Sequence, residues 1–70
     1  MPKLPGVNHL QAVRAFEKLG FSVWRQRGHI IMRKAKQVLV IPRHNPINAF
    51  TMGGIIKDAG LTVDEFKKLL

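Results

Sequence analysis

The chain contains no cysteine and few acidic residues. The absence of cysteine excludes disulfides and thiolate metal sites. The longest uninterrupted apolar run, Val38–Ile41, is too short to span a bilayer. The first five residues, Met-Pro-Lys-Leu-Pro, lack the apolar core of a signal peptide. These absences predict a cytoplasmic protein whose stability comes from packing.

The length and the hydrophobic fraction are those of a small folded domain. Seventy residues, 46% of them hydrophobic, suffice for one core near the lower size limit of independent folding. We therefore expect a single domain over residues 1–70. Two prolines and a glycine within residues 1–7 predict an extended lead-in.

Acidic residues are missing from the middle of the chain. Twelve Lys and Arg face four acids, for a net charge of +8, and no acid lies between Phe21 and Ile47. That stretch contains His29, His44 and six cations, namely Arg25, Arg27, Arg33, Lys34, Lys36 and Arg43. A one-sided distribution of this kind favours a polyanion partner such as RNA. A merely soluble basic surface, or a surface for an acidic protein, would have the same composition.

Three segments have the apolar spacing of amphipathic helices. The first, over residues 8–20, opens on a capping box at Asn8, and the third opens on a full capping box at Thr62. The second, over residues 48–60, contains the pair Gly53-Gly54. Glycine costs a helix about 1 kcal/mol relative to alanine, so the pair predicts a close approach to another backbone or to a phosphate.

Between the first two helices the apolar period changes to two, which predicts strands. The first begins at Phe21, and Arg25 and Arg27 continue the face of Phe21, so we expect the strand to leave the core as it approaches the turn. Gly28 allows a reversal, a second strand follows over residues 29–33, and a third over residues 38–41. The order α-β-β-β-α-α predicts an α+β fold, a three-stranded antiparallel sheet with helices on one face.

Few residues are available for catalysis. The three histidines have no metal-ligand spacing, and no acid near them could complete a catalytic triad, so we expect neither a metal nor another cofactor. RNA carries its own nucleophile, the 2′-hydroxyl. One histidine can move the proton, and arginines can stabilise the phosphorane charge. His29 has this setting, although a histidine beside a hairpin glycine is also common as a plain surface residue.

Several segments in order resemble the HicA-type (YcfA-like) toxins. They are Leu19-Gly20-Phe21, Arg25-Gln26-Arg27-Gly28-His29, Val40-Ile41-Pro42-Arg43-His44, the run from Thr51 to Leu61, and Glu65-Phe66. The resemblance implies a fold like that of a double-stranded RNA-binding domain. It also implies a metal-independent endoribonuclease that cleaves mRNA with one catalytic histidine, here His29. A HicB-type antitoxin would cover the active face.

The hairpin differs from the family pattern in one respect. Members commonly have a residue between the glycine and the histidine, whereas here Gly28 directly precedes His29. The missing residue either tightens the turn or shifts the register, and a shift of one residue turns a side chain to the opposite face.

The residues leave other readings open. A non-catalytic RNA-binding module would use Arg25, Arg27, Gly28, Arg33, Lys34, Lys36, Arg43 and His44 for phosphate contacts alone. A protein-interaction domain would present the same basic face to an acidic partner. Trp24, the only tryptophan, could stack on a base or pack against the core.

Overall fold

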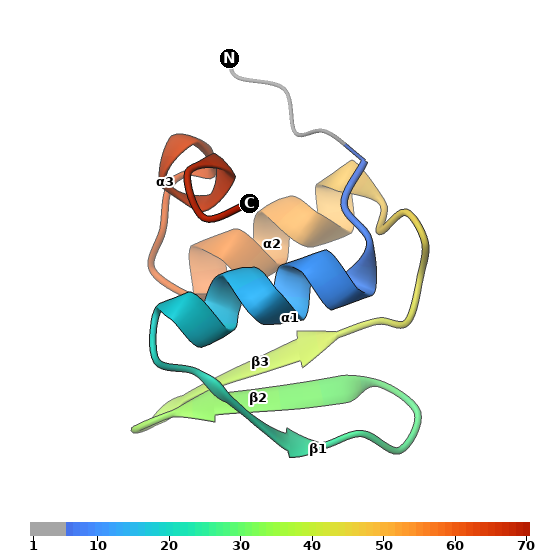
Figure 1. Ribbon diagram of the computed structural model, residues 1–70, viewed down its shortest axis with the longest axis vertical. Helices are drawn as coiled ribbons and strands as arrows, with labels where there is room; N and C mark the ends of the chain where they lie inside the picture. The colour runs from blue at the N-terminus through green and yellow to red at the C-terminus, as the bar shows by residue number, and fades with distance from the viewer. Residues whose placement is uncertain (1–5) are drawn as a thin grey trace.

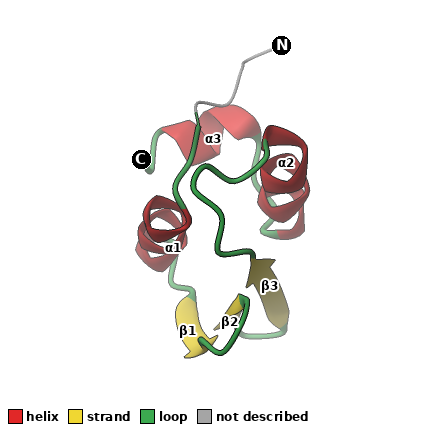
Figure 2. Cartoon of the chain, turned by 90° about the vertical axis from the view of Figure 1, so that its right-hand side faces the viewer, coloured by secondary structure: helices red, strands yellow, loops and turns green. Residues whose placement is uncertain are grey.

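The structure, a computed structural model that describes residues 6–70, places helices on one face of a three-stranded sheet (Figure 1). In Figure 2, α1 and α2 lie side by side above the sheet, and α3 lies beyond them. The expected α+β fold is confirmed. In chain order the elements are α1 His9–Lys18, β1 Ser22–Arg25, β2 Ile30–Lys34, β3 Gln37–Ile41, α2 Ala49–Asp58 and α3 Val63–Lys67.

The strands form an antiparallel meander whose two pairings differ in regularity. β2 and β3 pair without interruption from Ile30 opposite Ile41 to Lys34 opposite Gln37, across a two-residue turn. The pairing of β1 with β2 is interrupted by a bulge at Trp24.

The bulge overturns one prediction about β1. Val23 lies opposite the buried Met32, but the bulge then brings Arg25 opposite Ile31, which pairs with the exposed Val40. Paired residues share a face of the sheet. Arg25 therefore lies on the outer face, and the prediction that it continues the inward face of Phe21 was wrong.

The loop between β1 and β2 is longer than predicted. β1 ends at Arg25 and β2 begins at Ile30, so Arg27, Gly28 and His29 all lie in the loop formed by residues 26–29. The prediction of a strand beginning at His29 was wrong by one residue. Because His29 precedes the strand, the alternation of faces along β2 does not decide where its side chain points.

Local hydrogen bonds fix the helix ends as predicted. The Leu10 amide donates to Asn8 Oδ1 at 2.7 Å, and the Asn8 amide donates to Gln11 Oε1 at 3.1 Å. At α3, the Thr62 amide donates to Glu65 Oε1 at 2.9 Å, and the Glu65 amide donates to Thr62 Oγ1 at 3.2 Å. Both capping boxes are confirmed.

The core lies between the helices and the inner face of the sheet. Phe16 of α1 is its centre, with the Phe66 ring centroid 5.3 Å away and the Phe21 ring edge-on at 5.9 Å. Met32, Leu39, Ile41, Met52 and Ile56 fill the rest, each almost fully buried. The described part of the chain buries no polar or charged residue. This packing holds both ends of the sheet under the helices.

The expected extended lead-in falls mostly outside the described residues. Of the two described residues in it, Val7 is buried and forms an isolated bridge with Ile47, whose amide donates to the Val7 carbonyl at 2.7 Å. This bridge ties the start of α1 to the loop before α2.

The glycine pair in α2 makes no close contact with another part of the described chain. A Cβ atom added at Gly53 or at Gly54 would meet no other atom within 4 Å. The prediction of a close backbone approach was wrong, because both positions face open space.

Candidate active site

A hollow of about 190 Å³ lies at one end of the sheet, where three segments converge. His29 comes from the β1–β2 loop, Pro42 and His44 from the loop after β3, and Asn48 and Thr51 from the start of α2. Figure 1 shows the two loops at the same end of the sheet. The sheet register explains the meeting, because the last β2–β3 pair is Ile30 with Ile41 and the chain continues beyond it to His29 and Pro42.

Arg43 joins the two loops directly. Its Nε–H donates to the Gly28 carbonyl at 2.6 Å, and its Nη2 donates to the Gln26 carbonyl. Two donors of one planar guanidinium therefore hold the turn that precedes His29. The sequence predicted Arg43 as a phosphate contact, whereas the structure commits at least two of its N–H groups to the backbone.

The backbone at His44 has a second anchor. The Nδ1–H of His9, in the first turn of α1, donates to the His44 carbonyl at 3.3 Å. The bond gives His9 a part in positioning the loop. The side chains of His29 and His44 are exposed and line the hollow.

The start of α2 contributes two polar side chains that sequence reasoning did not assign to the site. Asn48 caps the helix, its Oδ1 accepting from the Phe50 amide at 2.8 Å, which leaves the side-chain amide nitrogen as a donor. Thr51 adds a hydroxyl three residues later. Phe50 between them is 92% exposed. The signal that could have identified them is their i, i+3 spacing in a helical turn that follows a histidine-containing loop.

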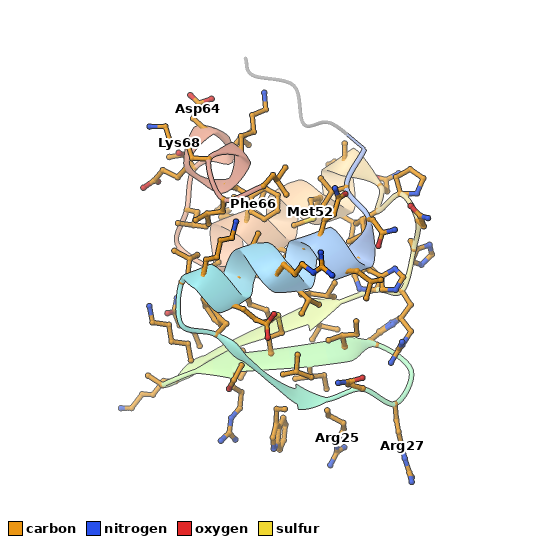
Figure 3. All side chains as sticks on the ribbon, viewed as in Figure 1. Arg25, Arg27, Met52, Asp64, Phe66 and Lys68 are labelled. Atoms are coloured by element: carbon orange, nitrogen blue, oxygen red, sulfur yellow. The ribbon has the colours of Figure 1, made fainter. Side chains whose placement is uncertain are left out.

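Arg25 and Arg33 lie on the outer face of the sheet. Their guanidinium carbons stand 5.2 and 4.8 Å from the ring centroid of Trp24, so the two cations flank the exposed indole. Figure 3 shows Arg25 and Arg27 projecting away from the helices. These arginines form a basic surface around an aromatic ring next to the β1–β2 loop.

The remaining predicted contacts, Lys34 and Lys36, lie at the opposite end of the sheet. Lys34 ends β2, four residues from Ile30, which places it roughly 13 Å along the strand from the hollow. Its Nζ stands 5.9 Å from the ring centroid of Phe21. The structure thus brings together His29, Gly28, Arg43 and His44, and it separates them from these two lysines.

Two further observations concern residues 6–70 alone. No three of their histidine and acidic side chains gather as metal ligands. None of their helices has the length and apolarity needed to cross a membrane.

The family model of the HicA toxin of bacterial toxin–antitoxin systems matches residues 11–61 of the chain. The chain belongs to the HicA toxin family. The matched region contains both loops, the hollow and the flanked Trp24. Membership in this family implies an antitoxin partner. Searches among curated proteins and among solved structures found no match.

Proposed function

We propose that this HicA toxin is a metal-independent endoribonuclease that cleaves mRNA, with His29 as a catalytic residue. The observation that carries the proposal is the placement of His29. Its side chain is exposed at a hollow of about 190 Å³, and the turn before it is held by Arg43. Because the substrate is mRNA, the protein acts in the cytoplasm.

The proposed reaction needs only groups that the chain and the RNA supply. His29, as the free imidazole, takes the proton of the 2′-hydroxyl, and the 2′-oxygen attacks the adjacent phosphorus. The bond from phosphorus to the 5′-oxygen breaks, and the departing oxygen is protonated from solvent, to which His29 returns the proton that it accepted. The products are a 2′,3′-cyclic phosphate and a 5′-hydroxyl. The Asn48 amide and the Thr51 hydroxyl line the same hollow and can donate to the phosphate oxygens.

The basic surface supports binding of the RNA strand. Arg27 lies in the loop that carries His29, and Arg25 and Arg33 flank Trp24 beside it. Arginines neutralise phosphates, and an exposed ring can stack on a base. Lys34 and Lys36 lie at the far end of the sheet and would contact a more distant part of the bound RNA.

Cleavage of an oligoribonucleotide in the presence of a chelator tests the proposal. The parent protein is expected to cleave it, and His29→Ala is expected to be slower by roughly 10²–10⁴-fold with an unchanged circular dichroism spectrum. Lys57→Ala, at the far end of α2, is the matched control and keeps full activity. A substrate with a 2′-deoxy sugar at the cleaved position must resist cleavage. Equal rates for His29→Ala and the parent would refute the proposal.

The second candidate function is RNA binding without cleavage, and the exposed Trp24 between two arginines favours it. In this case the affinity for RNA falls steeply with salt concentration, equally in the parent and in His29→Ala. Neither protein cleaves the RNA. Trp24 fluorescence measures the binding. An absence of RNA binding at low salt would exclude both RNA readings and leave a surface for an acidic protein.

We further propose that the antitoxin partner is of the HicB type and covers the hollow. The net charge of +8 favours a partner with acidic groups. Co-purification with the product of the adjacent reading frame tests this. The complex is expected to cleave RNA far more slowly than the free toxin, and cleavage at an undiminished rate would contradict the covering of the site.

A further inference from the structure

We propose that His44 is a second catalytic residue, which donates the proton to the leaving 5′-oxygen while His29 accepts the proton of the 2′-hydroxyl. The inference rests on the proposed ribonuclease function and extends it from one catalytic histidine to a pair. It starts from one observation, that His29 and His44 line the same hollow although they are 15 positions apart in the sequence.

The sheet and Arg43 bring the two histidines together. Ile30 and Ile41 are paired, so His29 leaves the sheet one residue before the pair and His44 lies three residues after it. Arg43, next to His44, donates from Nε to the carbonyl of Gly28, next to His29, at 2.6 Å. Each histidine is thus a direct chain neighbour of one partner in that contact.

The loop that carries His44 is held at several points, which restricts where its imidazole can go. The His44 carbonyl accepts from His9 Nδ1–H at 3.3 Å, and Pro42 fixes the start of the loop. Further along, the amide of Ile47 donates to the Val7 carbonyl at 2.7 Å. These anchors fix the backbone on both sides of His44, which is one of the residues that line the hollow.

The geometry of the reaction requires proton transfer at two places. In the in-line displacement the attacking 2′-oxygen and the leaving 5′-oxygen stand on opposite sides of the phosphorus. An imidazole that has accepted the proton on one side is not in reach of the oxygen on the other. His29 and His44 line one hollow from two different loops, so the site offers a separate imidazole for each of the two oxygens.

The proton count closes without any further reactant. His29 becomes imidazolium as the bond from the 2′-oxygen to phosphorus forms. The bond to the 5′-oxygen breaks, and imidazolium His44 protonates that oxygen and becomes neutral. Exchange with water then returns both histidines to their starting states. Asn48 and Thr51 line the same hollow, and their side chains can donate hydrogen bonds to the nonbridging oxygens.

A substrate with a sulfur leaving group separates acid catalysis from every other role. In a 5′-bridging phosphorothiolate, sulfur replaces the leaving oxygen, and a thiolate departs without first being protonated because a thiol is far more acidic than an alcohol. His44→Ala is expected to slow cleavage of the ordinary linkage by roughly 10²–10⁴-fold and to restore most of the parental rate on the sulfur linkage. His29→Ala is expected to remain slow on both linkages.

His44→Arg is the matched variant for a role in charge alone. Arginine keeps a cation at the position but does not release a proton near neutral pH. We expect His44→Arg to be about as slow as His44→Ala on the ordinary linkage. Lys57→Ala should cleave both linkages at the parental rate.

Three results would overturn the assignment. In the first, His44→Ala cleaves both linkages equally slowly. In the second, His44→Arg cleaves the ordinary linkage at the parental rate. In the third, the sulfur linkage restores cleavage by His29→Ala and not by His44→Ala. Restored cleavage of the sulfur linkage itself shows that His44→Ala is folded. A parent protein that cleaves neither linkage would instead refute the proposed ribonuclease function, so the two failures are distinguishable.

Discussion

Replacing the glycine pair in α2 by alanine is predicted to stabilise the protein, whereas most substitutions destabilise. Gly53 and Gly54 occupy the middle of a ten-residue helix, and a Cβ atom at either position would meet nothing within 4 Å. Alanine at both positions therefore adds no clash. Alanine has less conformational freedom than glycine in the unfolded chain. Folding therefore costs less conformational entropy, and the folded state is stabilised.

The expected gain follows from the helix propensities. Each Gly→Ala replacement in a helix interior is worth about 0.5–1 kcal/mol. Neighbouring positions in a helix do not face each other, so the two contributions should add to about 1–2 kcal/mol. In a chain of this size the midpoint of thermal unfolding rises by about 4–8 °C per kcal/mol.

Urea and thermal unfolding of the Gly53→Ala/Gly54→Ala double variant measure this gain, and Gly60→Ala is the matched control. Gly60 has a φ of +79°, and the nearest atom to an added Cβ, Gln37 Nε2, is 4.0 Å away. Alanine there has space but the wrong backbone conformation, at a cost of about 1–2 kcal/mol. A double variant no more stable than the parent, or Gly60→Ala at parental stability, would refute the reasoning.

Three further predictions concern other contacts. Arg43→Ala should slow RNA cleavage by up to about 10²-fold and speed the amide hydrogen exchange of Gly28 and His29, because the loop loses two hydrogen-bond donors. Arg43→Lys should not restore the cleavage rate. The Thr62 amide, and then its hydroxyl, hold the pKa of Glu65 below its ordinary value of 4.5. The cap's stabilisation is therefore present above that value and lost as pH falls through the lowered pKa, a dependence that Glu65→Gln should remove from pH-dependent urea unfolding. Phe66→Ala should cost about 3–5 kcal/mol, measured by urea unfolding, because its buried ring packs on Phe16.

Much of the fold could be predicted because its signals are local. The capping boxes at Asn8 and Thr62 involve groups three residues apart, and both form as expected. The alternation of apolar residues located all three strands, with errors only at their ends. The bulge at Trp24 was not predictable, because it depends on how β1 fits its neighbour, and it reversed the face of Arg25.

The site was only partly predictable. His29 and His44 were both identified from their residue type and their basic surroundings. Neither Asn48 nor Thr51 was assigned to the site. Arg43 was assigned to phosphate because a sequence cannot show which acceptors a guanidinium will reach.

The sequence by itself determined the kinds of element, their order, the helix caps, the basic character of the hairpin and the family resemblance. These depend on periodicity, on residue type and on contacts within one turn. Only the tertiary structure decided that His29 and His44 share one hollow and that Arg43 is used to hold a loop. Those contacts join residues 15 to 17 positions apart. They exist because the pairing of β2 with β3 brings both loops to the same end of the sheet.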